Sequence, residues 1–516
     1  MIRDIQLRVS PKEAATAELY TKAAARKAGI NTNQITHVRI LKRSVDARQR
    51  TIWINLNVRL YINEEATDDV VPVFEYPDVH EGKQVVIVGA GPAGLFAALR
   101  CIEKGLKPIV LERGKKVAER KRDIAVLNRS HVVDPDSNYG FGEGGAGTFS
   151  DGKLYTRSVK RGNVKRILEV LCFHGATTDI LIDAHPHIGT DKLPAVITNI
   201  RATIENAGGK VYFSSKVTGL ILEDNTVKGV RTHDGNEYMG PVILATGHSA
   251  RDVYRFLDQS QVLLESKTFA MGVRVEHPQE LINQIQYHSP KGRGDYLPAA
   301  SYALTAQVSE RGVYSFCMCP GGFIVPSATS PGEVVVNGMS PSLRNSRWAN
   351  SGIVVEVRPE DIGSDSEPLK GLDYQENLEK EAFESGGQTQ VAPAQRLDDF
   401  VQNRHSKSLP SSSYVPGLLS SPLHEWLPKS IRYRLQQGFR QFDNKTRGFL
   451  TNEALIAGVE SRTSSPVRIP RNRETFEHVS IKNLYPCGEG SGYAGGIVSS
   501  AMDGENAAEA LAARMG

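Results

Sequence analysis

Three glycines and one acid in the first quarter of the chain have the types and spacing needed to bind a dinucleotide. Residues 85–94 read VVIVGAGPAG, and Glu112 follows the next apolar run. In such a turn the first glycine permits a tight bend, the second lets a pyrophosphate approach bare backbone, and the third lets a helix pack close to the strand. A carboxylate roughly 20 residues further on accepts hydrogen bonds from ribose hydroxyls. The pattern predicts the adenosine half of a dinucleotide site.

A buried strand, a helix and a second strand must position these residues. We expect the first strand at 85–88, the helix at 95–104 and the second strand at 108–111. The N–H groups and dipole at the start of the helix then face the phosphates, so no cationic side chain is needed there. A glycine-rich turn without a ligand is the alternative. The order of strand, helix, strand and acid favours the dinucleotide site.

Two later segments are also dense in glycine. The loop 139–153 reads YGFGEGGAGTFSDGK, which indicates a backbone pressed against a ligand, although a flexible hinge remains open. A buried strand at 241–244 runs into the glycine turn 245–247. Segment 484–504 contains a strand, an acid and a Gly-Gly helix start. It could hold the pyrophosphate and ribityl part of an extended dinucleotide. The N-terminus of the helix would then point at the ring attached to the ribityl chain.

The composition is that of a globular chain in a reducing compartment. Of 516 residues, 40% are hydrophobic and 23% charged, and the five cysteines do not suggest a disulfide framework. The sequence has no apolar run of about 18 residues, and its N-terminus is too polar to open a signal peptide. We therefore expect a cytoplasmic protein without a membrane span. It has no Cys/His spacing for zinc and no second Gly-x-Gly-x-x-Gly, so we expect no metal and no separate nicotinamide-dinucleotide domain.

Charge is distributed unevenly along the chain. Residues 1–61 contain 12 Lys or Arg and 4 Asp or Glu, a net charge of +8, whereas the whole chain carries +4. Such a segment could hold an anionic partner, RNA included, by neutralising phosphates. The alternative is a solvated face on a docked accessory domain. We favour that alternative because no RNA-binding signature accompanies the charge.

Taken together, the motifs resemble the FAD-binding halves of the glutathione-reductase-like flavoprotein superfamily. Within this superfamily, the motifs are similar to those of bacterial proteins described as FAD-dependent dehydrogenases, which also carry a small N-terminal domain. The resemblance covers essentially the whole chain and implies FAD as cofactor, without a settled substrate. The segments that carry it are 85–112, 245–247, 488–496, 142–154, 186–192 and 316–322.

The resemblance also implies a set of cofactor contacts. Within this set, the backbone N–H groups of Gly496 and Ile497 would stabilise the anionic reduced flavin. The implied contacts are Gly89, Ala90, Gly91, Pro92, Ala93 and Gly94 to the pyrophosphate; Glu112 and Arg113 to the adenosine; Val217 to adenine through its backbone; Ala245, Thr246 and Gly247 over the nucleotide; Gly144, Gly145 and Thr148 along the ribityl chain and flavin; Gly488 and Glu489 to the pyrophosphate and ribityl hydroxyls; and Gly496 and Ile497 to the N1 and C2-carbonyl edge.

Two basic residues are the catalytic candidates. Lys153 ends the glycine loop and is our first candidate for a group beside the flavin ring. A pairing with a phosphate or carboxylate is equally compatible with its position. Arg462 could clamp an anionic substrate or a nicotinamide phosphate. A structural ion pair with Glu460 or another acid explains it as well.

Two further pairs have a weaker claim to chemistry. His185 and His187 flank Pro186, which favours satisfied histidines in a fixed loop. Cys317 and Cys319 could form a dithiol relay with the flavin, but they are tighter than a redox Cys-x-x-Cys and would form a strained ring. Alternating cysteines on a strand face opposite sides, so two small core residues are the favoured interpretation.

We therefore expect an α/β protein with a Rossmann-like FAD-binding domain of the glutathione-reductase-like type. The expected domains are a small basic α+β accessory domain at 1–72, the FAD-binding domain at 83–268 and 449–516, and an inserted α+β cap or substrate domain at 269–448. Residues 63–80 are expected to be the linker into the nucleotide domain.

The expected function is an FAD-dependent oxidoreductase that transfers hydride through flavin N5 to or from an unknown small molecule. NAD(P)H, if it is the transient electron donor, would dock directly over the flavin. Two alternatives remain open: a flavoprotein that modifies or binds RNA through the basic N-terminal domain, and a non-catalytic or sensory flavoprotein.

Overall fold

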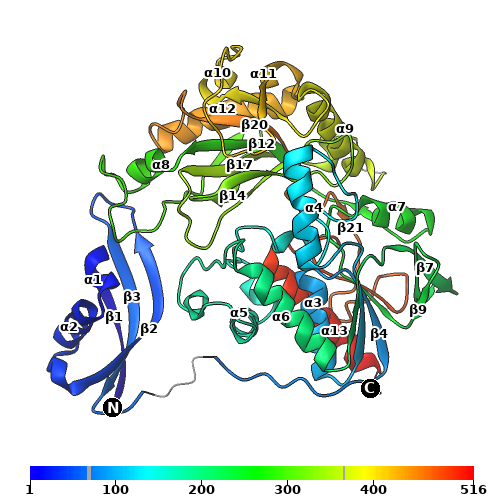
Figure 1. Ribbon diagram of the computed structural model, residues 1–516, viewed down its shortest axis with the longest axis horizontal. Helices are drawn as coiled ribbons and strands as arrows, with labels where there is room; N and C mark the ends of the chain where they lie inside the picture. Colours follow the sequence, from blue (N-terminus) through cyan, green and yellow to red (C-terminus); the bar gives the residue numbers. More distant parts are fainter. Residues whose placement is uncertain (67–70, 364–366, 516) are drawn as a thin grey trace.

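A five-stranded parallel sheet forms the centre of the lower half of the molecule in Figure 1. The computed structural model describes residues 1–66, 71–363 and 367–515. Residues 67–70 of the expected linker lie outside this description. Strand β4 occupies the middle of the sheet, as expected for an apolar run without alternation. In order across the sheet the strands are β22 (Leu484–Pro486), β10 (Val242–Leu244), β4 (Gln84–Val88), β5 (Lys107–Leu111) and β6 (Lys210–Tyr212).

Both faces of this sheet are covered, because successive side chains of a strand point to opposite sides. Val85 and Ile87 of β4 pack into a core shared with a helical layer, and Val86 and Val88 pack into a second core on the other face. The helical layer contains α3 (Pro92–Glu103), α5 (Val164–Phe173), α6 (Leu193–Asn206) and α13 (Ile497–Met515), and the second layer contains β7 (Val217–Glu223), β8 (Thr226–Thr232), β9 (Glu237–Met239) and α7 (Arg251–Gln259).

A seven-stranded sheet forms the upper half of the molecule (Figure 1). Its pairings are antiparallel except for the last, which is parallel. The strands are, in order, β13 (Thr305–Val308), β14 (Arg311–Cys319), β17 (Trp348–Val357), β12 (Phe269–Pro278), β20 (Leu455–Glu460), β18 (Ala392–Arg396) and β19 (Leu418–Ser420). The helices of this half are α8 (Gln279–Gln286), α9 (Lys370–Ser385), α10 (Leu397–Val401), α11 (Leu423–Trp426) and α12 (Lys429–Lys445).

Smaller elements complete the upper and middle parts of the molecule. Helix α4 (Val117–Ser130) runs between the two halves in Figure 1 and contributes to a small core with Val325 and Ala328. Two further two-stranded sheets are present in the described chain. They are β15 (Phe323–Pro326) with β16 (Val336–Met339), and β11 (Glu265–Ser266) with β21 (Val467–Arg468).

The position of β20 bears on the expected domain division. The sequence assigns 449–516 to the FAD-binding domain, yet β20 pairs with β12 and β18 in the seven-stranded sheet. The chain returns to the lower half only after this strand, where β22 and α13 follow. The pairing of β20 favours a boundary after residue 460 rather than at 448. The division into domains otherwise remains a prediction.

The N-terminal segment folds into a three-stranded antiparallel sheet with two helices on one face (Figure 1). The sheet order is β1 (Ile2–Val9), β3 (Trp53–Ile62) and β2 (Ile35–Asp46). Its helices are α1 (Pro11–Ala15) and α2 (Ala17–Ala28). They are separate because Thr16 between them is extended, with φ −120° and ψ 113°.

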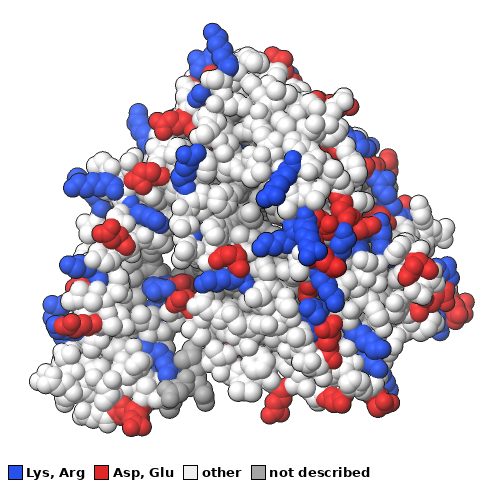
Figure 2. Space-filling model, in the orientation of Figure 1, with Lys and Arg blue, Asp and Glu red and all other residues white. Residues whose placement is uncertain are grey.

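Acidic partners offset part of the positive charge of the N-terminal segment. Figure 2 shows blue and red side chains intermixed over this part of the visible face. Arg59 pairs with Asp4 at 2.8 Å, and Arg48 pairs with Asp46 at 2.8 Å. Arg43 reaches across to Asp183 at 2.7 Å and so attaches the segment to the rest of the protein. The charge is therefore spread among ion pairs on the face that Figure 2 shows.

Gly94 permits the close packing of α3 on the end of β4. A Cβ at this position would lie 1.9 Å from the carbonyl oxygen of Gly89. We expect Gly94→Ala to lower the free energy of unfolding by about 1–3 kcal/mol, because the helix must move away from the strand. Gly219→Ala is the control, since a Cβ there would meet nothing within 4 Å. Chemical denaturation followed by circular dichroism measures both, and equal stability of the two variants would contradict the packing argument.

Candidate active site

A cavity of about 390 Å³ lies where the parallel sheet faces the seven-stranded sheet. Residues at the carboxyl ends of β4, β5 and β10 line one part of it, and residues of β14 and of the segment after β20 line another. Strand β4 stands between β10 and β5: the chain passes from β4 outward to β5 and β6, and later adds β10 on the other side of β4. Ligands of open α/β sheets bind at this kind of switch point, outside the carboxyl ends of the strands.

The turn between β4 and α3 has the geometry that the glycine spacing predicts. Gly89 adopts φ +103°, a left-handed conformation that favours glycine. Gly91 is the N-cap residue of α3 and has no side chain to cap the helix. The first N–H groups of α3 therefore lack partners within the helix and stand at the cavity wall, where Gly91, Pro92 and Ala93 are lining residues. This arrangement suits an anionic group.

The carboxylate of Glu112 joins three loops at this end of the cavity. One oxygen accepts the N–H of Ala90 at 2.8 Å, and the other accepts the N–H groups of Gly114 and Gly142 at 2.9 Å each. The residue is 5% exposed and lines the cavity. The acid expected to meet a ribose thus also fixes the glycine turn and the start of the glycine loop.

Bare backbone forms much of the cavity wall. A Cβ at Gly247, Gly495 or Gly496 would meet nothing within 4 Å, because each faces open space. Gly145 lies directly beside Gly91 in the wall, where a Cβ on Gly145 would come within 3.1 Å of the Cα of Gly91. A wall without side chains fits a ligand that packs against main-chain atoms, as the pyrophosphate and ribityl chain of a dinucleotide do.

Most of the residues expected to bind the cofactor line this cavity. Besides the residues already described, they are Arg113, Val217, Ala245, Thr246, Glu489 and Ile497. Five others lie behind the wall and shape its backbone: Ala90, Gly94, Gly144, Thr148 and Gly488. The hydroxyl of Thr148 donates to the carbonyl oxygen of Glu143 at 2.7 Å, and the N–H of Gly488 donates to Asp503 at 2.8 Å.

Lys153 lies at the other end of the cavity, beside a pair of cysteines. Its Nζ is 3.0 Å from a carboxylate oxygen of Asp151, 3.7 Å from Sγ of Cys317 and 3.5 Å from Sγ of Cys319. Burial opposes the charge of Lys153, but the two thiols and Asp151 outweigh burial and raise the pKa of Lys153. The ammonium thus stays charged at the cavity wall. The pairing with a carboxylate that the sequence leaves open is present.

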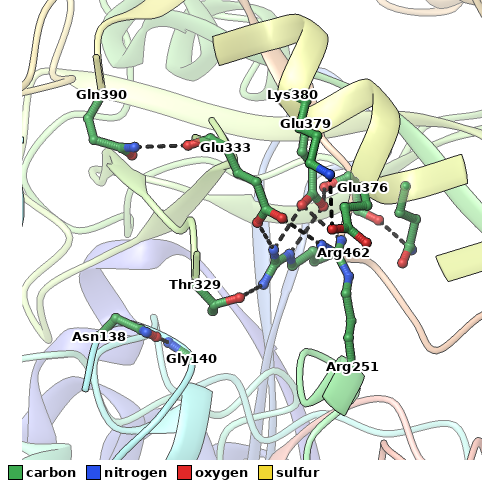
Figure 3. A network of polar contacts seen from close by, with 12 residues as sticks. Asn138, Gly140, Arg251, Thr329, Glu333, Glu376, Glu379, Lys380, Gln390 and Arg462 are labelled. Carbon is green, nitrogen blue, oxygen red and sulfur yellow. Dashed lines mark hydrogen bonds and ion pairs between the residues drawn. The ribbon is translucent and has the colours of Figure 1, made fainter. Parts of the chain in front are cut away.

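Arg462 lines the cavity but is held by acids behind it (Figure 3). Its guanidinium lies 2.9 Å from Glu333 and 2.8 Å from Glu379, and it donates to the hydroxyl of Thr329. Arg251 pairs with the same two glutamates at 3.0 and 2.8 Å. The ion pair left open by the sequence is therefore present, with partners other than Glu460.

The two glutamates of this network have widely different pKa values. Burial, reinforced by the charge of Glu379, raises the pKa of Glu333 to about 7. Burial acts in the same direction on Glu379, but Arg462 and Arg251 overcome it and lower the pKa of Glu379 to about 2. Near neutral pH the network therefore exchanges a proton at Glu333.

The sequence motifs miss one titratable residue that lines the cavity and anticipate only part of the role of a second. His248 directly follows the turn 245–247, which is the one signal that could have found it, and burial followed by the charge of Arg462 lowers its pKa to about 3. Its Nε2 is 3.8 Å from Glu489. Glu489 is expected from the sequence only as a cofactor ligand, yet burial and then Cys317 raise its pKa to about 7.

His185 and His187 stand apart from the lining residues. The ring of His185 packs on Tyr155 at 4.9 Å between centroids, and Nε2 of His187 is 3.1 Å from the carbonyl oxygen of Ser342. Both are thus engaged in contacts between loops. Among residues 1–66, 71–363 and 367–515, no group of three or more His, Cys, Asp or Glu is arranged to hold a metal ion.

Known proteins resemble this chain over its whole length. An uncharacterised protein of Clostridium beijerinckii is 40% identical over 507 residues, which are 95% of this chain and 94% of that protein. The family description "FAD-dependent protein, C-terminal domain-like" matches residues 268–463, and "FAD binding domain" matches residues 84–119. The chain belongs to this family of FAD-dependent proteins. Residues 1–61 match a domain of unknown function.

Other known proteins match less of the chain or at lower identity. A digeranylgeranylglycerophospholipid reductase of Methanosarcina mazei is 30% identical over 162 residues, and the match spans 30% of this chain and about a third, 34%, of the reductase. The solved structure of CtdE in complex with FAD has a TM-score of 0.33 and 12% identity, covering 83% of this chain and 84% of that one. The matches to the FAD-dependent and FAD-binding families show that the cofactor is FAD, as the resemblance implies. No helix within the described chain has the length and apolar character to cross a bilayer.

The raised pKa of Glu333 predicts how the stability of the protein depends on pH. The native state keeps the proton up to about pH 7, whereas the unfolded chain loses it near the usual value of 4.5. The stabilisation from this group is therefore complete below pH 4.5 and declines as the pH rises to about 7. Relative to Glu333→Gln, the wild type should lose stability over that interval and level off above it.

Denaturant unfolding at closely spaced pH values measures this difference. Glu425→Gln is the control, because the side chain of Glu425 is 70% exposed. We expect the difference between wild type and the control to be flat over the same interval. If the difference in stability between wild type and Glu333→Gln is equally flat, Glu333 is ionised in the native state throughout this pH interval.

Proposed function

We propose that this protein is an FAD-dependent oxidoreductase whose small-molecule substrate reacts at the Lys153 end of the cavity. One observation carries the proposal. A single cavity joins the glycine turn at Gly89 and Gly91 to a cluster of titratable side chains, Lys153, Cys317 and Glu489. A nucleotide-binding turn needs no such cluster, whereas a redox reaction that moves protons does.

The cofactor-binding part of the proposal uses the cavity wall. The pyrophosphate lies at the N-terminus of α3, and the adenosine lies toward Glu112, Arg113 and Val217. The ribityl chain follows the bare backbone of the glycine loop and of the turn at Thr246 and Gly247. The five residues behind the wall act by holding the backbone of these segments. A glutathione-reductase-like arrangement of the domains belongs to this proposal.

FAD, when bound, supplies two-electron chemistry by accepting or donating a hydride at N5. Gly496 and Ile497 stand at the start of α13, where the helix dipole favours a neighbouring negative charge. Lys153 adds a fixed positive charge to the same cavity. Glu489 has a pKa of about 7 and can give or take a proton near neutral pH.

Two alternatives have less support. An RNA-modifying or RNA-binding flavoprotein requires the basic N-terminal segment, where acids such as Asp4 and Asp46 pair with some of the arginines and no RNA-binding signature accompanies the remaining charge. A sensory or non-catalytic flavoprotein requires no titratable groups at the far end of the cavity. NAD(P)H as the electron donor is part of our proposal, and it would have to enter the same cavity as the substrate.

An anaerobic titration with NADH and then NADPH tests the proposed function. The flavin absorbance band should bleach with one of the two donors. If neither bleaches it, the protein is reduced by its own substrate or carries a non-catalytic flavin, and reduction by a substrate library then separates those outcomes. A purified protein that neither contains FAD nor takes it up would overturn the proposal.

Gly91→Val tests the pyrophosphate position. Gly91 has an extended backbone, φ −76° and ψ −176°, which valine also adopts, and a Cβ there has its nearest neighbour at 3.9 Å. We expect the variant to fold but to bind FAD more than about tenfold more weakly, because the side chain occupies the place where the phosphates meet the backbone. Gly219→Val is the matched control and should retain FAD, as measured by absorbance after gel filtration.

A further inference from the structure

A break in the pairing of β14 brings Cys317 to the cavity. Phe316 pairs with Gly352 of β17, but the next pair joins Cys319 to Asn350, so two residues of β14 oppose one of β17. Cys317 in this bulge has φ +45°, a left-handed conformation that is uncommon for a residue with a side chain. Two cysteines one residue apart would face opposite sides of a regular strand. The bulge instead places both sulfur atoms beside the ammonium of Lys153.

Charged side chains surround the two sulfur atoms, and each of the two nearest cations is paired with a carboxylate. Lys153 and Arg344 both pair with Asp151, at 3.0 and 2.7 Å. Arg274 is fully buried, pairs with Glu460 at 3.0 Å and lies 3.4 Å from Sγ of Cys319. Burial raises the pKa of Glu460 to about 7 against the pull of Arg274, so this carboxylate is easily neutralised. When Glu460 is protonated, a negative charge on the sulfur atoms would serve as the counter-charge of Arg274.

Only one of the two sulfur atoms is available to a molecule in the cavity. Cys317 lines the cavity with Lys153 and Glu489, whereas Cys319 is fully buried. The contact with the thiol of Cys319 lowers the pKa of Cys317 most; burial opposes this, and Lys153 and Arg274 reinforce it. The same contact and burial raise the pKa of Cys319. Because Lys153 lies within 3.7 Å of both sulfur atoms, its charge acts on the pair, and Cys317 is the member of the pair that lines the cavity.

We propose that Cys317 is a nucleophilic thiolate of the cavity, held by Lys153, Cys319 and Arg274, and that it reacts with soft electrophiles that enter there. In the step, the electron pair of the sulfur forms a new bond to the electrophilic carbon or sulfur. The bond from that atom to its leaving group breaks, and the leaving group departs with its electron pair. No net oxidation occurs. The step needs no hydride transfer, so it goes beyond the oxidoreductase function proposed above although it uses the same end of the cavity.

Alkylation with iodoacetamide tests this proposal on the FAD-loaded protein. Samples are treated from pH 6 to pH 9, and mass spectrometry locates and times the modification. We expect Cys317 to react first, with a rate whose midpoint lies below the value of about 8.5 for an ordinary thiol. The charged groups that can shape the profile are Lys153, Arg274, Arg344, Asp151, Glu460, Glu489 and Cys319. The other cysteines, all buried, should stay unmodified in the native protein.

Two lysine variants separate charge from mere accessibility. Lys153→Met should slow alkylation of Cys317 at pH 7 by about tenfold and move the midpoint toward that of a free thiol. Lys153→Arg keeps the charge and should keep the midpoint low. Cys317→Ser should abolish the fast modification while its FAD content is measured separately by absorbance.

The outcomes of these alkylation experiments decide the proposal without any measurement of catalytic turnover. Failure of Cys317 to react in the folded, FAD-loaded wild type would overturn the proposal, as would a midpoint at or above about 8.5. Equal rates for the wild type and Lys153→Met would also overturn it. A protein that reacts as expected but is reduced by no donor would support the thiolate and count against the oxidoreductase function, so the two proposals fail independently.

Discussion

The nucleotide end of the cavity depends on one carboxylate. Glu112 accepts backbone N–H groups from the turn after β4, from the segment after β5 and from the glycine loop, all within 2.9 Å. Backbone donors buried away from water must find acceptors, and loops rich in glycine have no side chains of their own to supply them. A single buried acid thus fixes three flexible segments relative to one another. Gly91 and Gly145 consequently lie close together, so that a Cβ on Gly145 would come within 3.1 Å of the Cα of Gly91.

The other end of the cavity depends on buried charge. Arg274 with Glu460, and Arg462 with Glu333 and Glu379, lie between the seven-stranded sheet and the cavity. Removing one partner of a buried pair leaves an uncompensated charge, which is far more destabilising than the pair itself is stabilising. These networks therefore fix the relative positions of β12, β20 and α9. They also keep a positive field near Cys317 and Lys153 inside an environment of low polarity.

The extent to which the sequence predicts the site differs along the chain. The first turn is local: Gly89, Gly94 and the strand before them lie within ten residues, and their geometry follows from backbone sterics alone. The expectation for Thr148 illustrates the limit, because its hydroxyl is used by Glu143 and faces away from the cavity. Nothing in a glycine-rich loop says which of its side chains point outward. The assignment of β20 depends likewise on pairing with β12, more than 170 residues away in the chain.

The sequence by itself determined the cofactor class and the parallel sheet around β4, because a tight glycine turn between a buried strand and a helix is specified by neighbouring residues. Only the tertiary structure decided the chemistry at the far end. Lys153, Cys317 and Arg274 come from segments separated by more than 40 residues, and a bulge turns Cys317 out of the alternation of its strand. Contacts of this kind depend on how sheets pack and where a strand breaks register, which no local pattern records.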